Sequence, residues 1–218
     1  MTRLSPRLEK ALEYTKGFSL LADIGTDHAL LPIKAVSFGY VPRAIAIDNK
    51  QKPLDNAKKN IVKAKLDQAI TAVLSDGLSN VQEPCDVVAI LGMGGIAIAE
   101  ILGKANLQSV KRLILSPNSE SEVVREWLEQ HQFMLEDEHF LEDKHKYYQL
   151  IIAKPGQMTL TPIEREFGPI ILKKRNTTFQ DHLNRMIYQL QSALNKTRNQ
   201  SEQSVLIDRI KLLKGLIR

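Results

Sequence analysis

The sequence has little cysteine, and its one thiol, Cys85, limits what the protein can contain. A single cysteine cannot form a disulfide within the chain, and it cannot supply the thiolate cluster of a structural zinc site. The histidines show no metal-ligand spacing either, so we predict no metal site. Low cysteine use is typical of a reducing compartment, and we expect a cytoplasmic protein.

Long hydrophobic runs are also absent. No stretch approaches 18 uninterrupted apolar residues, and residues 3–13 mix Arg, Lys and Glu, so we expect neither a membrane span nor a signal peptide. The hydrophobic fraction of 43% and the charged fraction of 25% are those of a folded globular protein, which excludes a disordered chain.

Positive charge is concentrated in the last 64 residues. Residues 1–154 contain 19 Lys and Arg against 20 Asp and Glu, whereas residues 155–218 contain 11 against 5. Proteins use such an excess to bind phosphate backbones, but a solvated helical surface carries the same kind of charge. Charge alone leaves nucleic-acid binding and a plain basic surface equally open.

Short apolar runs rich in β-branched residues alternate with segments of helical periodicity. The expected strands cover 20–24, 44–47, 70–74, 87–91 and 113–115. The expected helices cover 30–38, 53–64, 96–102 and 122–131, after a leading helix that Ser5 would cap. This alternation predicts an α/β fold with a mostly parallel sheet.

The pattern changes after the fifth expected strand. Residues 133–140 and 147–153 are strand-like runs with no room for a helix between them, so they should pair antiparallel. Apolar residues then recur at steps of three and four along 179–194 and 206–217, which predicts an antiparallel helical pair or short coiled coil. We therefore predict a sheet domain over 1–156 and a helical, basic domain over 157–218.

Polar or glycine-rich residues follow the expected parallel strands. Ligands of open parallel sheets bind outside the carboxyl ends of the strands, so these residues are the first candidates for a site. They are Asp23-Ile24-Gly25-Thr26-Asp27-His28, Asp48-Asn49, Ser75-Asp76-Gly77, Gly92-Met93-Gly94-Gly95 and Ser116-Pro117-Asn118. Each motif alone is more often a turn than a site, but their joint placement favours a ligand.

The expected ligand is a nucleoside without a pyrophosphate. A glycine turn after the first strand, followed about 25 residues later by an acid, Asp48, is the arrangement that holds ribose hydroxyls. The nicotinamide motif G-x-G-x-x-G is missing, and Asp27 would repel a pyrophosphate, so a nicotinamide oxidoreductase is the least favoured alternative. S-adenosylmethionine carries a cationic sulfonium and no phosphate, and it suits an acid-lined mouth better.

With these motifs in place, the sequence resembles the bacterial tRNA (adenine22-N1)-methyltransferases. The run from Leu21 to Ala29, the Gly92–Gly95 loop and the pair Pro117-Asn118 carry the resemblance, which extends over nearly the whole chain. It implies a Rossmann-like class I methyltransferase fold of seven strands with an antiparallel last strand. It also implies S-adenosylmethionine over the first four strands and a helical C-terminal domain that helps to hold tRNA.

The resemblance implies a set of cofactor-binding residues: Asp23, Gly25, Asp48, Asn49, Asp76, Gly77 and Gly92. Among them Asp48 would take the ribose hydroxyls, Asp76 would read the adenine amino group, and Gly92 would lie beside the sulfonium. It also implies substrate-binding residues at the next two strand ends: Met93, Gly94, Gly95, Pro117 and Asn118. The glycine loop supplies no aromatic ring on which the target base could stack.

The transfer itself needs no base to remove a proton first, because adenine N1 has a lone pair that can attack the sulfonium methyl directly. The methylated base becomes cationic, so a nearby anion would help. We predict that Asp27 is the catalytic residue, accepting a hydrogen bond from the adenine amino group and favouring the developing charge. The structural alternative for Asp27 is an N-cap of the helix that follows.

A stacked adenosine must be extruded before its N1 can react, and contacts elsewhere must offset that cost. The basic residues predicted to contact tRNA phosphates are Lys173, Lys174, Arg175, Arg185, Lys196 and Arg198. We expect a monomer. Two alternatives stay open from the sequence: a small-molecule methyltransferase on the same fold, and a non-catalytic RNA-binding protein.

Overall fold

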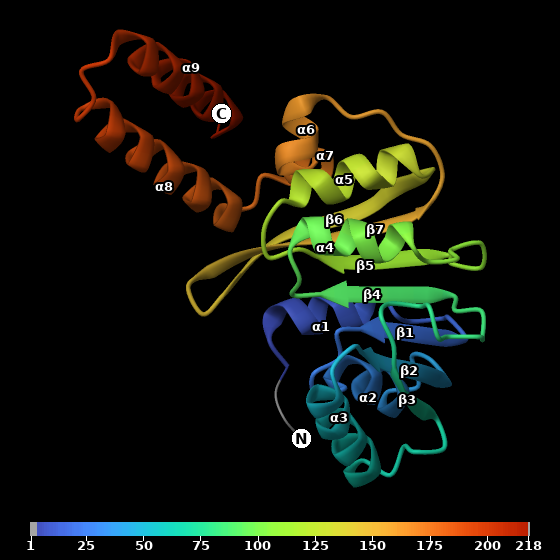
Figure 1. The fold of residues 1–218 in the computed structure, drawn as a ribbon. Helices are drawn as coiled ribbons and strands as arrows, with labels where there is room; N and C mark the ends of the chain where they lie inside the picture. Colours follow the sequence, from blue (N-terminus) through green and yellow to red (C-terminus); the bar gives the residue numbers. More distant parts are fainter. Residues whose placement is uncertain (1–3, 218) are drawn as a thin grey trace.

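The computed structural model describes residues 4–217, which form a seven-stranded sheet covered by helices on both faces and a projecting pair of long helices (Figure 1). The strand order is β3-β2-β1-β4-β5-β7-β6, and all neighbours up to β5 pair in parallel. The strands are β1 (Leu20–Ile24), β2 (Arg43–Asp48), β3 (Ile70–Leu74), β4 (Val87–Leu91), β5 (Arg112–Ser116), β6 (Phe133–Asp143) and β7 (Lys146–Pro155). The predicted α/β fold and its parallel strands are confirmed.

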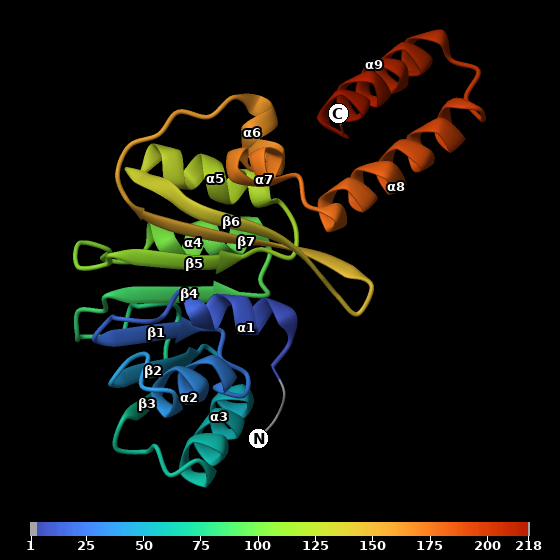
Figure 2. The same ribbon diagram turned by 180° about the vertical axis from the view of Figure 1, so that it is seen from behind.

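Two hydrophobic layers sandwich the sheet. Buried residues of α1 (Pro6–Glu13), α2 (Leu30–Ser37) and α3 (Gln51–Lys63) pack on one face. Those of α4 (Gly95–Gly103) and α5 (Ser121–Gln130) pack on the other. Figure 2 shows the face that α1 covers. The first turn of α1 lies near the carboxyl edge of the sheet, where Arg7 contacts Asn118 beyond the end of β5.

The leading helix begins as the sequence predicts. Ser5 has extended backbone angles, its Oγ accepts a hydrogen bond from the Leu8 amide at 3.3 Å, and Pro6 opens the helix where no amide donor is needed.

The two last strands form an antiparallel hairpin, as predicted, but they are longer than the hydrophobic pattern indicated. The polar stretch 141–146 was expected to be a loop, and most of it belongs to β6 and β7. Only Lys144 and His145 make the turn, both with positive φ (50° and 64°), which is the geometry of a tight two-residue hairpin. Polar residues form strand here because cross-strand pairing continues beyond the hydrophobic core, and the hairpin projects from the body (Figure 1).

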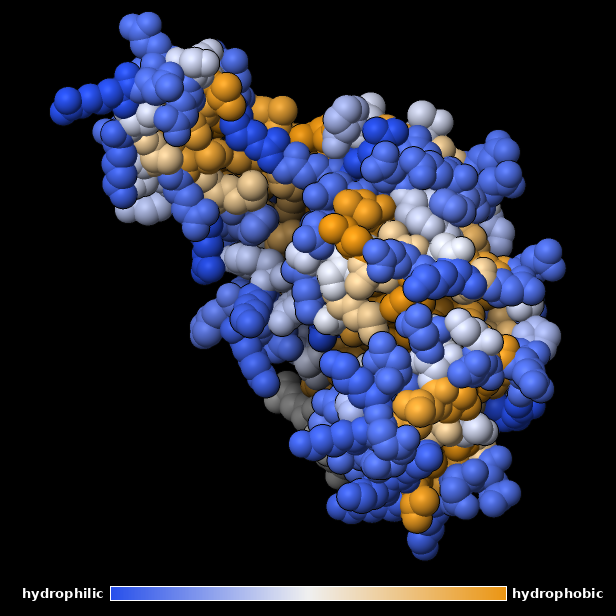
Figure 3. All heavy atoms as spheres, in the orientation of Figure 1, coloured by the Kyte–Doolittle hydropathy of each residue, from blue (hydrophilic) through white to orange (hydrophobic). Residues whose placement is uncertain are grey.

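The chain ends in four helices: α6 (Pro162–Phe167), α7 (Pro169–Lys174), α8 (Thr177–Leu194) and α9 (Gln200–Ile217). The predicted seam is present, since Phe179, Leu183, Ile210 and Leu213 are buried in one cluster. Figure 3 shows hydrophobic residues along the seam between α8 and α9, with hydrophilic residues over the outer surface. The connection between these helices, 195–199, is shorter than the polar run 195–204 that suggested it.

A buried ion pair joins the sheet to the C-terminal helices. Arg125 of α5 and Glu138 of β6 are both fully buried, with Nε to Oε1 at 2.7 Å. Arg125 also donates to the backbone carbonyl of Arg165 in α6, and Glu138 accepts from the amide of Ile170 in α7. Helices α6 and α7 are thereby fixed to the sheet, while α8 and α9 pack mainly on each other. The domain boundary at residue 156 stays a prediction.

Candidate active site

The topology of the sheet orders the candidate residues along one edge. The loops after β3, β2, β1, β4 and β5 lie side by side in that order. The edge therefore runs from Asp76, through Asp48 and Asp23, to Gly92 and Asn118. A nucleoside bound at the Asp76 end and a substrate bound at the Asn118 end would lie in the order that the motifs predict.

A hollow opens at the middle of this edge, beyond the end of β1. It has a volume of about 280 Å³, and residues 25–31 line it together with Arg7, Leu8, Asp23 and Leu91. Leu31 is buried, whereas the side chains of Asp27 and His28 are exposed. We call this feature the strand-end hollow. It combines an apolar wall with carboxylates and one guanidinium, which is a donor and acceptor set for a zwitterionic, cationic ligand.

Asp23 is the buried acid of the strand-end hollow, with 7% of its surface exposed. Burial, together with a smaller contribution from the nearby charge of Asp48, raises the pKa of its carboxyl group from 3.8 to about 6. A buried carboxylate of this kind is stabilised when a cationic group binds beside it.

Gly25 makes the turn that follows β1. Its φ of +80° favours glycine, and a Cβ at this position would collide with Cε of Met93. The close approach of these two loops holds the turn after β1 against the glycine loop after β4.

Asp27 does not cap the helix that follows it. Helix α2 is preceded by Ala29 in the left-handed conformation, with no side-chain cap. The capping alternative for Asp27 is therefore wrong for this structure. Its carboxylate is 64% exposed and lies 3.1 Å from Nε2 of His28, at the rim of the strand-end hollow.

Asp48 and Asp76 follow the outer strands β2 and β3. Asp48 is 9% exposed, and its Oδ1 accepts the Lys50 amide at 2.9 Å, which holds the Asp48-Asn49 turn. Asp76 is exposed and lies 3.5 Å from Nζ of Lys104. Gly77 beside it has φ +60° and lies close to Ile101. Packing against Ile101 therefore explains this glycine as well as clearance for a ligand does.

The glycine loop is held by the residues that follow β5. Nδ2 of Asn118 donates to the Gly92 carbonyl at 2.6 Å, and its backbone amide donates to the Met93 carbonyl at 2.8 Å. A Cβ at Gly95 would collide with the backbone of Glu120, so this glycine permits close packing of α4. Asn118 thus has a direct structural link to the predicted substrate loop, and Gly95 has a packing reason of its own.

Arg7 and Tyr148 lie at this edge and were not among the predicted site residues. Nη1 of Arg7 donates to Oδ1 of Asn118 at 3.3 Å, and its guanidinium lies 4.5 Å above the ring of Tyr148 in β7. Nε of Arg7 and Oγ of Ser116 are buried without a hydrogen-bond partner in the part of the chain described. No local motif marks Arg7, because its partner Asn118 is 111 residues away.

The basic residues predicted to contact tRNA lie in the C-terminal helical region. They differ in whether their side chains already contact another residue. Lys173, Lys196 and Arg198 are exposed. Nζ of Lys174 lies 2.5 Å from Oδ1 of Asp137, and the guanidinium of Arg185 lies 5.2 Å from the centre of the Tyr147 ring. Arg175 donates through Nε to the Leu172 carbonyl. Contact of any of them with RNA stays a prediction.

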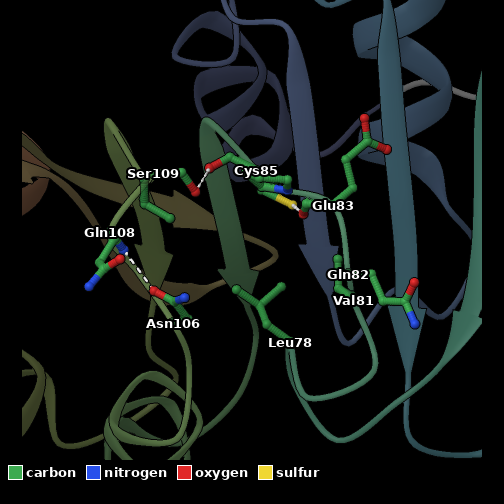
Figure 4. A pocket seen from close by; sticks show the side chains of 10 residues that line it. Leu78, Val81, Gln82, Glu83, Cys85, Asn106, Gln108 and Ser109 are labelled. Carbon is green, nitrogen blue, oxygen red and sulfur yellow. Dashed lines mark hydrogen bonds between the residues drawn. The ribbon is translucent and has the colours of Figure 1, made fainter.

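A second hollow, of about 210 Å³, lies around Cys85 near the amino end of β4, away from the strand-end hollow (Figure 4). Burial raises the pKa of the Cys85 thiol to about 11, so it is protonated and a poor nucleophile. Among residues 4–217 no group of His, Cys, Asp and Glu is arranged to hold a metal ion. In the same range no helix is long and apolar enough to cross a membrane.

Comparison with known proteins gives one consistent answer. Residues 21–215 match the model of the family described as TrmK, tRNA (adenine(22)-N(1))-methyltransferase. A Bacillus subtilis protein named tRNA (adenine(22)-N(1))-methyltransferase is 33% identical over 231 residues, covering 99% of this chain and 97% of its own.

Solved structures agree over the full length. The M. capricolum TrmK in complex with S-adenosyl-homocysteine has 31% identity and a TM-score of 0.88, with 100% of each chain covered. A Streptococcus pneumoniae protein solved in complex with S-adenosyl-L-methionine has 34% identity and a TM-score of 0.91, covering 99% of this chain and 100% of its own.

Proposed function

The chain belongs to the tRNA (adenine(22)-N(1))-methyltransferase family, and from that premise we propose how its own residues carry out the transfer. Its activity is the S-adenosylmethionine-dependent methylation of adenine 22 of tRNA at N1. The mechanistic proposal rests on the carboxylate of Asp27, which is exposed at the rim of the strand-end hollow and does not cap α2.

The strand-end hollow fits the methionine part of the cofactor. Asp23 offers a buried carboxylate for the ammonium group, and Arg7 offers a cation with an unpartnered Nε for the carboxylate. Asp48 and Asp76 follow in order along the edge, and we propose that they hold the ribose and the adenine. These residues bind and orient the cofactor, which supplies an electrophilic methyl group on a sulfonium.

Asp27 acts on the target base. A carboxylate beside the base accepts a hydrogen bond from the exocyclic amino group and turns N1 toward the methyl group. It also stabilises the positive charge that develops on the ring during attack. His28 lies 3.1 Å from the carboxylate and keeps it at the rim, and no proton transfer is assigned to it. Most of the acceleration comes from alignment, which contributes on the order of 7–11 kcal/mol in well-oriented reactions.

The C-terminal helices supply the contacts that offset extrusion of the adenosine. Unstacking a base costs a few kcal/mol, and phosphate contacts away from the reacting base can offset it. We propose that Lys173, Lys196 and Arg198, which are exposed on α7 and on the α8–α9 connection, provide these contacts. Arg175, Arg185 and Lys174 would add to them once tRNA competes for their present partners.

The test of the mechanism is the substitution Asp27→Asn. The amide keeps the size of the side chain but loses the charge, and we expect kcat on unmodified tRNA to fall roughly 100-fold. The affinity for S-adenosyl-homocysteine should change little, because the proposed partner of Asp27 is the amino group of the target base and not a group of the cofactor. Turnover is followed by transfer of a labelled methyl group, and affinity by calorimetry.

The matched control is Asp67→Asn, which removes an exposed carboxylate near the start of β3, at the opposite edge of the sheet. Its turnover should equal that of the wild type. A wild-type rate in Asp27→Asn would show that the carboxylate has no part in the transfer.

A further inference from the structure

The glycine loop leaves one requirement of the reaction unmet. An extruded adenine needs a flat surface to replace the stacking that it loses, and Met93, Gly94 and Gly95 offer no ring. An aromatic side chain from another element must then lie near Gly92, or the base is held by hydrogen bonds alone.

Most aromatic residues of the described chain are committed elsewhere. Tyr14 bonds Asp137, Phe18 lies beneath Arg112, and Phe38 packs on Tyr40. Trp127 stacks on His131 and packs on Phe133. The remaining rings lie in or on the C-terminal helical cluster: Phe140, Tyr147, Phe167, Phe179 and Tyr188. Of the aromatic rings in residues 4–217, only Tyr148 is linked to the substrate side of the sheet edge.

The link runs through Arg7. Its guanidinium lies 4.5 Å from the centre of the Tyr148 ring, and a Cβ on Gly92 would lie 3.5 Å from its Nη2. One guanidinium therefore lies over the ring and next to Gly92, beside which the sulfonium is expected. The same group donates to Asn118, whose Nδ2 holds the Gly92 carbonyl.

The strand geometry explains why the ring is there. Side chains alternate across β7, and Leu150 and Ile152 face the layer that α1 covers. Tyr148 lies on that face as well, two residues before Leu150, near the carboxyl edge where β7 runs beside β5. It is half-buried, so part of its surface remains open.

We propose that Tyr148 binds the extruded target adenine by stacking, with Arg7 holding the other face of its ring. This proposal rests on the methyltransferase function proposed above. A tyrosine face suits this base in particular, because methylation at N1 turns the ring into a cation, and cations are attracted to aromatic faces. The negative charge of Asp27 and the ring of Tyr148 would then stabilise the same developing charge.

The test compares Tyr148→Leu with Tyr148→Phe in the full-length protein, on unmodified tRNA at saturating S-adenosylmethionine. We expect Tyr148→Leu to lower kcat/KM for tRNA by about 10- to 100-fold, the size of one lost base–aromatic stack. Tyr148→Phe should retain at least about a third of the wild-type value, because it keeps the ring on which the base stacks and loses only the hydroxyl group.

The matched control is Tyr40→Leu, which removes a ring that also lies under a cation, Lys16, but far from the site. Its kcat/KM should be that of the wild type. The affinity for S-adenosyl-homocysteine should be within about twofold of wild type in both Tyr148 variants, since stacking concerns the base alone. A parallel loss of cofactor affinity would show that Tyr148 acts through Arg7 on the cofactor, which overturns the proposal.

A second measurement uses the unmodified protein, so it does not depend on whether Tyr148→Leu folds. Transfer RNA carrying 8-azidoadenosine at position 22 is irradiated with the protein and S-adenosyl-homocysteine, and the adduct is located by peptide mass spectrometry. An adduct on Tyr148 supports stacking, whereas adducts confined to other residues overturn it. If the wild type methylates adenine 22 and Tyr148→Leu is equally active, this inference fails while the proposed function stands.

Discussion

At the scale of single residues, we predict that the carboxyl group of Asp23 makes cofactor binding depend on pH. Burial raises its pKa to about 6 in the ligand-free protein, and a bound ammonium group favours its ionised form. Affinity should therefore rise with pH up to about 6 and level off above it. Between pH 7.5 and pH 5 we expect S-adenosyl-homocysteine to bind about tenfold more weakly.

Calorimetric titrations across this range check the prediction, with Asp23→Asn as the control. The amide variant should bind more weakly at pH 7.5 and show a flat profile. An equally steep profile in Asp23→Asn would assign the dependence to another group.

The same pKa shift has the opposite effect on stability. The folded pKa lies above the unfolded value of 3.8, so the folded state binds the extra proton between pH 4 and pH 6. The contribution of Asp23 to the free energy of unfolding is therefore present at low pH and is lost as pH rises through about 6. The acid is retained at a cost to folding, as expected for a ligand-binding residue.

The buried pair of Arg125 and Glu138 governs stability at the junction of the sheet and the C-terminal helices. Arg125→Met should lower the free energy of unfolding by about 3–5 kcal/mol, because the carboxylate of Glu138 is left buried without its partner. Urea unfolding followed by circular dichroism gives this value.

Two further variants separate charge from packing at this junction. Arg125→Met combined with Glu138→Leu should be more stable than Arg125→Met alone, because no unpaired charge remains. Lys10→Met breaks the exposed pair Lys10–Glu13 and should unfold at nearly the wild-type urea concentration. A double variant less stable than the single one would show that hydrogen bonds to the helices matter more than charge.

At the scale of elements, the strands were the most predictable part. The runs 20–24, 70–74 and 87–91 coincide with β1, β3 and β4. β1 and β4 lie inside the sheet and are almost wholly buried, so they read as continuous apolar runs, whereas the edge strand β3 is partly exposed and was found by its β-branched residues. The ends of β6 and β7 were missed because their outer pairs are polar. Hydrophobic patterning marks burial and not hydrogen bonding, so a hairpin that projects beyond the core is invisible to it.

The candidate site divides in the same way. The acids and glycines at the ends of β1 to β4 could be found because topology alone brings strand ends together. The roles of Arg7 and Tyr148 could not, since they depend on how α1 and β7 pack against the loop after β5. Hydrophobic periodicity gives the face of a helix, but it does not identify the loop that its first turn meets.

The basic residues of α7 and the α8–α9 connection give a prediction for these elements. Replacing Lys173, Lys196 and Arg198 together by Gln should weaken tRNA binding at every salt concentration. It should also reduce the slope of log affinity against log salt by about 2 to 3, since each lost phosphate contact releases one counterion fewer. Filter binding between 50 and 200 mM salt, the range in which such contacts are resolved, checks this.

The control removes three exposed lysines near the opposite edge of the sheet: Lys63, Lys65 and Lys111. Its net charge matches that of the first variant, so a general effect of charge would appear equally in both. Equal slopes for the two variants would contradict a tRNA site on the C-terminal helices.

For the whole molecule, the fold separates the chemistry from the recognition of a large substrate. In the proposed mechanism cofactor and base meet at the sheet edge, while the net positive charge of the chain lies in residues 155–218, which include the two helices that project beyond it (Figure 1). Contacts of the buried Arg125 and Glu138 with the last residues of α6 and the first turn of α7 hold the base of this projection to the sheet. Such an arrangement suits a substrate much larger than the catalytic hollow, as tRNA is.

The most direct test of the account is methyl transfer by the wild-type protein to two tRNA transcripts, one with adenine and one with guanine at position 22. The account predicts 1-methyladenosine in the first transcript, located at position 22 by mass spectrometry, and no label in the second. Equal labelling of both transcripts, or none in either while S-adenosyl-homocysteine still binds, would contradict it.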